Sequence, residues 1–302
     1  MDKSQGKLEN EACIVTGGNS GIGKEVAYGL MSQGAHVFLA CRDLEKCGQA
    51  KADLDSRGSR GSCECRKLDL CCFSSVREFA HNMRKEKRVK RGLKVLVNNA
   101  GVMGHAPSDD PLVDGHLLPN HLGPFLLTSE LLPIMKPGSR IVNVSSRAHF
   151  QGSLQIQPDA SGRPVITGRP LTWYHSYARS KLCNVLHAAE LQRRLDDEGR
   201  AVGVHSVSPG LVSTGIFRNL WAPLRWAASP LVRAVYQTPE QGARTVLHAA
   251  SAPELEGRRA LYLHNMSEQP PSALAQDPTL AKQLWLASEH IVCSVARSRS
   301  GS

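Results

Sequence analysis

The chain of 302 residues has no stretch of about 18 consecutive apolar residues, so we expect no membrane-spanning helix. It shows no secretory signal before its first strand-like segment, no internal repeat and no linker rich in Pro, Gly or Ser. With 41% hydrophobic residues, the chain can bury one large core. These features favour a cytoplasmic protein with one domain over residues 8–293 and a disordered tail at 294–302.

Acidic residues are fewer than basic ones, at 27 against 37, which gives a formal net charge of +10. The densest basic run, residues 84–91, follows a helical pattern. Cations suit the carbonyl end of a helix and stay hydrated there. We therefore expect a solvated helix end and no nucleic-acid partner.

The nine cysteines are an odd number, and no secretory signal accompanies them, which favours a reducing compartment over a disulfide framework. Four of them lie close together, at Cys63, Cys65, Cys71 and Cys72. Neither pair has the C-x-x-C spacing of common zinc sites, and the first pair alternates along a strand-like segment. We expect no metal site.

A glycine-rich segment, TGGNSGIG at residues 16–23, lies between a strand-like run at 12–15 and a helical pattern at 24–31. Glycine allows close backbone approach, and the free N–H groups at a helix start favour a negative charge. This segment predicts a strand-to-helix turn that holds the pyrophosphate of a nucleotide cofactor.

Further strand-like runs alternate with helical patterns along the chain, at residues 34–41, 62–70, 93–97, 140–144 and 202–207. This alternation predicts an α/β fold with a doubly wound parallel sheet, the Rossmann fold. Small polar residues follow several of these runs. We expect them to meet in a ligand crevice at the carboxyl ends of the strands.

The second predicted strand ends at Cys41, which is not an acid that could bind a ribose hydroxyl, and Arg42 follows it immediately. A guanidinium there can pair with a 2′-phosphate, which points to NADP(H) rather than NAD. A surface arginine without a ligand is the alternative.

Tyr177 and Lys181 are four residues apart, which on a helix places both on one face. A nearby cation lowers the pKa of a tyrosine, so the phenol could exchange a proton with a substrate oxygen. An amphipathic helix surface is the alternative for this pair alone.

These motifs follow one another in a fixed order, which includes a strand end at Asn98-Asn99-Ala100-Gly101, paired serines at Ser145-Ser146 and a turn at Pro209-Gly210. In this order the chain resembles the short-chain dehydrogenase/reductase family over residues 8–293. It is most similar to the retinol dehydrogenase branch at three segments, namely ACRD at 40–43, NHLGPFLLT at 120–128 and SKLCNVL at 180–186.

The resemblance implies residues that bind the cofactor. The expected phosphate turn consists of Gly17, Gly21 and Gly23, lined by Asn19, Ser20 and Ile22. The adenosine half is expected to contact Arg42, Asp69, Leu70, Asn98 and Ala100. The nicotinamide half is expected to contact Tyr177, Lys181, Pro209, Gly210 and Thr214.

The resemblance also implies the catalytic residues. Tyr177 is the expected acid/base, and Lys181 binds the nicotinamide ribose and lowers the tyrosine pKa. Ser146 is expected to hydrogen-bond the reacting oxygen, with Ser145 as the alternative. Asn120 would complete the proton path through a helix kink and a water.

Two segments depart from the family pattern. The approach to Asn120, residues 113–119, is shorter than the retinol branch implies, and Pro119 removes a backbone donor there. Residues 147–172 form an extra segment between the serines and Tyr177, for which one interpretation is an inserted loop without a chemical role. The short approach supports one alternative, a regulatory or scaffold protein that binds NADP(H) but turns over poorly.

Residues 216–226 are apolar and aromatic and are interrupted by a proline. By the resemblance they form a substrate lid, which favours a hydrophobic carbonyl or alcohol of retinoid, steroid or lipid type. Core packing and peripheral contact with anionic lipid remain alternatives for this segment, and a homodimer is also left open. A light-dependent pigment reductase is a lesser alternative, disfavoured by Leu211.

Overall fold

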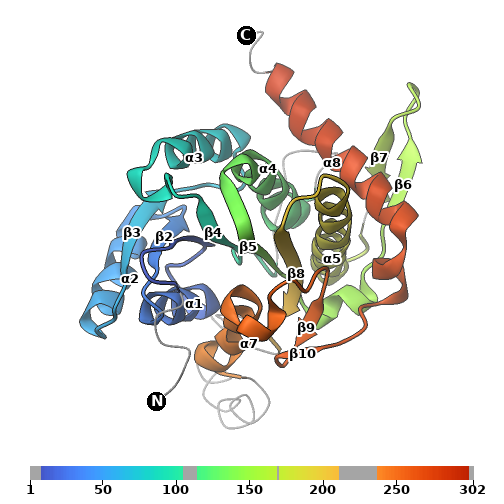
Figure 1. The fold of residues 1–302 in the computed structure, drawn as a ribbon. Helices are drawn as coiled ribbons and strands as arrows, with labels where there is room; N and C mark the ends of the chain where they lie inside the picture. Colours follow the sequence, from blue (N-terminus) through green and yellow to red (C-terminus); the bar gives the residue numbers. More distant parts are fainter. Residues whose placement is uncertain (1–7, 105–113, 169, 211–236, 299–302) are drawn as a thin grey trace, which may run out of the picture.

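The computed structural model describes residues 8–168, except 105–113, and residues 170–298, except 211–236. One sheet forms its centre, with strand order β10-β9-β8-β5-β4-β1-β2-β3 (Figure 1). Neighbours are parallel except the antiparallel pair β9 and β10. The strands are β1 (Ala12–Thr16), β2 (His36–Cys41), β3 (Ser62–Lys67), β4 (Leu93–Asn98), β5 (Met135–Val144), β8 (Val202–Ser208), β9 (Tyr262–His264) and β10 (Ser267–Glu268).

Helices cover both faces of this sheet, because alternate strand residues point to opposite sides. Cys13 and Val15 of β1 pack with the helices α1 (Gly21–Ser32), α2 (Leu44–Ser56) and α7 (Pro239–Ser251). Ile14, between them, packs with the opposite layer. That layer consists of α3 (Phe73–Lys85), α4 (Gly123–Leu131), α5 (Trp173–Asp197) and α8 (Pro278–Ser298).

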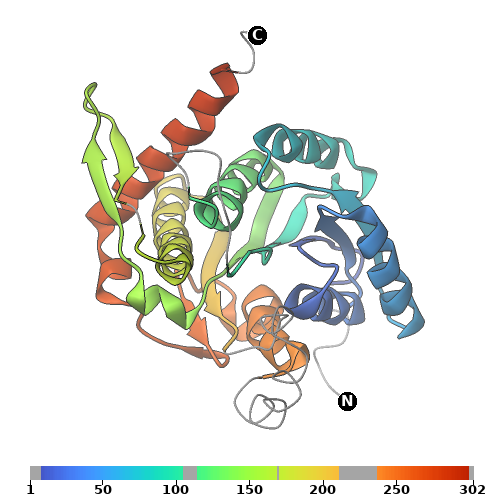
Figure 2. The same ribbon diagram turned by 180° about the vertical axis from the view of Figure 1, so that it is seen from behind.

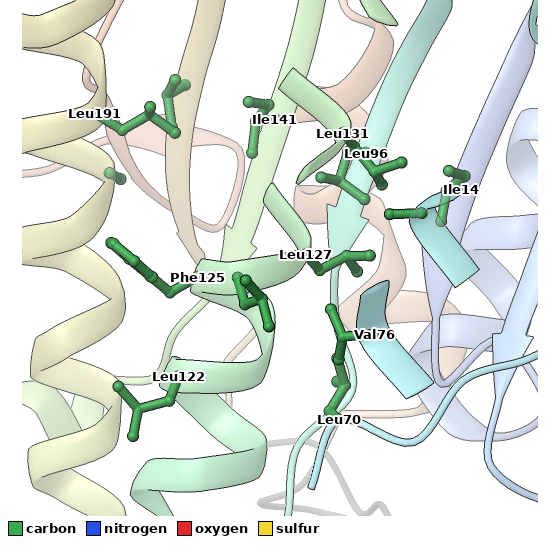
Figure 3. Close-up of a cluster of buried hydrophobic side chains, with 14 of the residues drawn as sticks. Ile14, Leu70, Val76, Leu96, Leu122, Phe125, Leu127, Leu131, Ile141 and Leu191 are labelled. Atoms are coloured by element: carbon green, nitrogen blue, oxygen red, sulfur yellow. The ribbon is translucent and has the colours of Figure 1, made fainter. Parts of the chain in front are cut away.

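The core of the second layer is formed where α4 packs on the strands (Figure 3). Ile14, Leu96 and Ile141, from three neighbouring strands, are fully buried there. Leu127 and Leu131 of α4 pack against them. This apolar contact fixes α4, and with it the residues just before α4, relative to the ends of β4 and β5.

The helix α8 lies across α4 and α5 and carries the Trp285 side chain into their contact. The Trp285 ring packs edge-on against Phe125 of α4 at 4.9 Å, and the Arg194 guanidinium of α5 lies 4.3 Å from its centroid. The His121 ring, just before α4, hydrogen-bonds the Ser288 hydroxyl of α8 at 2.9 Å. The helix continues to Ser298, so it includes residues 294–298 of the predicted tail.

The predicted α/β fold and all of the predicted parallel strands are confirmed, within a few residues at their ends. The sequence did not predict β9 and β10, or what residues 147–172 form. Instead of a plain loop, this segment contains a 3-10 helix at Arg147–Gln151 and a hairpin of β6 (Gln155–Pro158) and β7 (Pro164–Thr167). The hairpin packs beside α8, as Figure 2 shows from behind.

The basic run and the cysteines have separate outcomes. The run does end a helix, since α3 stops at Lys85, and Arg84 pairs with Glu130 at 2.9 Å. The sequence favoured a reducing compartment over a disulfide framework and did not predict that Cys47 and Cys65 form a disulfide. The packing of α2 on β3 brings their Cα atoms to 6.0 Å, a separation that a disulfide can span.

Within the described ranges, each helix is either too short or too polar to span a lipid bilayer.

Candidate active site

The glycine-rich segment forms the predicted turn between β1 and α1. Gly17 and Gly21 have positive φ angles of 66° and 53°, a conformation that favours glycine. A Cβ added at Gly23 would lie 2.5 Å from the Gly17 carbonyl oxygen and would also overlap the Asn99 amide. The turn therefore requires glycine where the sequence predicts a phosphate cradle.

Ser20 precedes α1 as its N-cap in an extended conformation, and its side chain makes no capping hydrogen bond in the described part of the chain. The first turn of α1 carries no acidic residue. Its backbone N–H groups and its positive dipole end can therefore receive an anion.

The ends of β1 and β4 are tied together by side-chain hydrogen bonds. The Thr16 hydroxyl accepts the backbone N–H groups of Asn99 and Ala100, both at 2.9 Å. The Asn98 amide donates to Asn143 and to Thr128, also at 2.9 Å, and is 3% exposed. Asn98 therefore braces neighbouring strand ends with its buried side chain.

Arg42 is exposed just beyond β2, and Lys67, the last residue of β3, donates to its carbonyl oxygen at 2.6 Å. Beside them, a hollow of about 370 Å³ reaches the glycine turn and is lined by Asn19, Ser20, Lys24, Lys46, Gln49, Ala50 and Asp53. Lys24 and Lys46 pair with Asp53 and Asp43, at 2.9 and 2.8 Å. This corner of the fold therefore carries four positively charged side chains, Arg42, Lys67, Lys24 and Lys46, of which the last two are paired with carboxylates.

The predicted adenine-binding pair follows β3 directly. The Asp69 carboxylate accepts the backbone N–H of Cys71 at 2.9 Å, which fixes the turn into α3. Leu70 is buried in the same core cluster as α4. Asp69 and Leu70 thus lie just beyond the carboxyl end of the outer strand β3. Because β2 and β3 are parallel, this is the same edge of the sheet at which Arg42 lies.

Tyr177 and Lys181 lie on one face of α5, with the Lys181 ammonium 5.6 Å from the centre of the Tyr177 ring. Burial lowers the pKa of Lys181 to about 8, and its Nζ donates to the Val144 carbonyl at 3.0 Å. Burial also raises the pKa of Tyr177, and a hydrogen bond with Ser146 acts in the opposite direction. The expected lowering of the tyrosine pKa is therefore not found here, because burial has the larger effect.

The two serines after β5 have different partners. The Ser145 hydroxyl is buried and donates to the Lys181 carbonyl at 2.7 Å. The Ser146 hydroxyl interacts with Tyr177 and accepts the Ala148 backbone N–H at 3.2 Å. Of the two hydroxyls, the one on Ser146 is the one beside the phenol.

A histidine that the sequence analysis did not single out holds the backbone of Ser146. His149 is fully buried, and its Nε2 accepts the backbone N–H of Ser272 at 3.1 Å. Its Nδ1 must therefore carry the proton, which it donates to the Ser146 carbonyl at 2.7 Å. Only its position three residues after Ser146 could have drawn attention to it.

Asn120 lies in a π-helical turn, Leu118–Leu122, that leads directly into α4. Its side-chain amide donates to the Ser180 hydroxyl at 2.9 Å and exchanges two hydrogen bonds with the backbone of Val102, at 2.7 and 3.0 Å. The expected helix kink is thus present as a widened turn, and Pro119 is accommodated within it.

Gly101 lies between the catalytic candidates. A Cβ added there would be 3.1 Å from the Asn120 side-chain oxygen and 3.4 Å from the Lys181 ammonium. Asn120 and Lys181 therefore face each other across a glycine.

The nicotinamide-side candidates are described only in part. Pro209 and Gly210 directly follow β8, and Gly210 has a φ of 90°. Thr214, Leu211 and the expected lid at 216–226 lie outside the described residues. Five exposed apolar side chains, which were missed from the sequence, lie close along the chain to candidate site residues, namely Val102, Met103, Phe150, Leu171 and Trp173.

Among the residues that the structure describes, no group of three or more His, Cys, Asp or Glu side chains is placed to hold a metal ion.

Comparisons with known proteins show the family to which the chain belongs. Residues 11–159 match the family model described as short chain dehydrogenase. The chain is 37% identical to polyprenol dehydrogenase of Danio rerio, over 91% of this chain and 84% of that protein. It is 38% identical to retinol dehydrogenase 11 of Homo sapiens, over 92% of this chain and 85% of that protein.

A solved structure from Beutenbergia cavernae with bound NADP at low occupancy has the same fold, with a TM-score of 0.63 and 27% identity over 86% of this chain and 96% of that chain. The chain therefore belongs to the short-chain dehydrogenase/reductase family, in its retinol dehydrogenase-like branch, and is an oxidoreductase of CH–OH or C=O groups.

Proposed function

We propose that the protein transfers a hydride between NADP(H) and a carbonyl or alcohol group of a hydrophobic substrate. The observation that carries this proposal is the meeting of Tyr177, Lys181, Ser146 and Asn120 beside the ends of β4 and β5. The glycine turn that would hold the cofactor phosphates lies at the end of the neighbouring strand β1.

The residues present fit a dinucleotide with a 2′-phosphate. Gly17 and Gly23 leave the cradle open where any side chain would fill it. Arg42 and Lys67 carry positive charge at the ends of β2 and β3, where the adenosine ribose of a Rossmann fold lies. The NADP found in the Beutenbergia cavernae structure supports the same choice.

When bound, the nicotinamide supplies or accepts the hydride. In the reducing direction, Tyr177 donates its phenolic proton to the substrate oxygen, and Ser146 donates a hydrogen bond to the alkoxide that develops there. Lys181 stabilises the phenolate that remains. Asn120 keeps this assembly aligned through Ser180, one residue before Lys181.

A hydrophobic substrate is supported by exposed apolar side chains close along the chain to the candidate residues and by the relatives. Trp173, at the start of α5, and Phe150, after Ser146, are each nearly half exposed, at 45% and 48%. The relatives named retinol dehydrogenase and polyprenol dehydrogenase act, according to their names, on hydrophobic alcohols. We infer a retinoid, steroid or lipid type of alcohol, aldehyde or ketone.

The test is a panel of hydrophobic aldehydes, ketones and alcohols, assayed by nicotinamide absorbance with NADP(H) and NAD(H) in parallel. The expected result is turnover with NADPH and at least one hydrophobic carbonyl compound. If the protein binds NADPH but turns over no compound of the panel, the result would instead favour the regulatory or scaffold protein that the short approach to Asn120 suggested. Equal affinity for NADPH and NADH would overturn the cofactor assignment.

A further inference from the structure

A partly buried ion pair joins the short approach before Asn120 to the catalytic helix. The Asp114 carboxylate pairs with the Arg179 guanidinium, and their side chains are 19% and 8% exposed. Arg179 stands midway between Tyr177 and Lys181 on α5. Asp114 is six residues before Asn120 in the sequence, at the start of the described part of the approach.

The same carboxylate organises the approach itself. One of its oxygens accepts the backbone N–H groups of His116 and Leu117, both at 2.9 Å. The Ser176 hydroxyl donates to that oxygen at 2.5 Å and accepts a hydrogen bond from the His116 ring nitrogen Nδ1 at 2.9 Å. Asp114 therefore caps the turn that leads to Asn120 and attaches it to α5 one residue before Tyr177.

Two anchors thus hold the approach against one stretch of α5. The first is Asp114 on Ser176 and Arg179, and the second is the Asn120 amide on the Ser180 hydroxyl. Arg179 also donates to the Gly168 carbonyl, just after β7, so the inserted hairpin shares the first anchor. Because the Asn120 side-chain oxygen and the Lys181 ammonium both lie close to Gly101, we expect a small shift of the approach to change the surroundings of the ammonium.

We propose that Asp114 and Arg179 are positioning residues, which set the place of Asn120 relative to Tyr177 and Lys181. This inference rests on the proposed function. The short approach leaves little chain with which to build a regular helix before Asn120, and the ion pair fixes that chain to the catalytic helix instead. Misplacement of reacting groups by about 1 Å can cost about 100-fold in rate.

The test compares the wild type with the double variant Asp114→Asn/Arg179→Met, which removes both charges and leaves neither buried without a partner. Turnover assays give the rate, and fluorescence titration with NADPH gives the concentration of sites that bind NADPH. Their ratio is kcat for each NADPH-binding site. We expect kcat to fall about 10- to 100-fold, with the NADPH Kd changed less than about threefold and the pH profile of kcat displaced. The variant Arg179→Lys, which keeps the charge but not the planar fork, should recover part of kcat.

The matched control is Asp159→Asn/Arg163→Met, which removes a more exposed ion pair of the same chemistry in the hairpin. Its kcat for each NADPH site should equal that of the wild type. If the Asp114/Arg179 double variant does not fold, Ser176→Ala removes only the neutral link, and we then expect a fall in kcat of about three- to tenfold.

A double variant with lower thermal stability but unchanged kcat for each NADPH site and an unchanged pH profile would overturn the positioning role. Wild-type protein without turnover would overturn the proposed function, and this inference with it. If the wild type turns over substrate and the variants keep its kcat and its pH profile, this inference alone would be overturned.

Discussion

Lys181 directs its ammonium at the carbonyl oxygen of Val144, 3.0 Å away and inside the protein. Burial of this cation costs free energy, and it lowers the lysine pKa from 10.5 to about 8. The catalytic helix therefore carries a group that destabilises the folded state at neutral pH, which is typical of a residue kept for chemistry.

The first prediction concerns Lys181→Met. Below pH 8 the lysine is charged in both the folded and the unfolded state, so the folded protein is destabilised by the full free-energy cost of burying the cation. Between pH 8 and 10.5 the folded state loses its proton first, so the penalty disappears as the pH rises. We expect the variant to be more stable than the wild type at pH 7, by up to about 3 kcal/mol, and the gap to close toward pH 10.

Thermal unfolding of both proteins across this pH range checks that prediction, with the exposed Lys46→Met as the control. A gap that does not change with pH would show that Lys181 is not a buried cation.

The second prediction concerns Tyr177→Phe, which removes one oxygen and leaves the ring packed. We expect kcat to fall by about 10²- to 10⁴-fold, because the acid/base group is lost. The NADPH Kd should stay within about threefold, since the cradle is untouched. Undiminished turnover would rule out the acid/base role of the phenol.

The third prediction separates the two serines. Ser146→Ala should lower kcat about 10²- to 10³-fold, because it removes a donor to the developing alkoxide. Ser145→Ala should lower the free energy of unfolding by about 1 kcal/mol, through loss of its bond to the Lys181 carbonyl, and should affect kcat less. The reverse pattern in kcat would assign the role to Ser145.

The fourth prediction concerns Arg42→Ala. Loss of a charge-assisted pair with the 2′-phosphate should raise the NADPH Kd about tenfold or more and leave the NADH Kd unchanged. Arg91→Ala, which removes an exposed charge in the basic run, is the control for general electrostatics. An equal loss of affinity for both cofactors would contradict the assignment of Arg42.

The fifth prediction compares two glycines. Gly23→Ala places a Cβ 2.5 Å from the Gly17 carbonyl, so we expect a loss of about 1–3 kcal/mol in stability and at least a tenfold weaker NADPH Kd. At Gly48 in α2, no heavy atom lies within 4 Å of an added Cβ. Gly48→Ala should therefore raise stability by about 0.5–1 kcal/mol and leave cofactor binding alone.

The sequence predicted the parallel sheet because local pattern decides it. Apolar runs such as 12–15 and, apart from Lys94, 93–97 are buried on both faces, and glycine at 17, 21 and 23 is required by one turn. These signals lie within a few residues of one another, so no knowledge of tertiary contacts is needed.

The features that the sequence did not predict depend on contacts between distant segments. The β6–β7 hairpin is short and contains prolines, and it packs against α8, more than 100 residues later. The Cys47–Cys65 disulfide depends on how α2 packs on β3. The raised pKa of Tyr177 reflects burial, which the four-residue spacing to Lys181 could not reveal.

The position of α8 also limits how two copies of the chain could assemble. Through Trp285 and Ser288, this helix occupies the outward surfaces of α4 and α5 with residues of the same polypeptide. A second molecule could pair through those surfaces only after α8 had been displaced and its tryptophan brought into water. Any homodimer that keeps this helix in place must associate through another part of the protein.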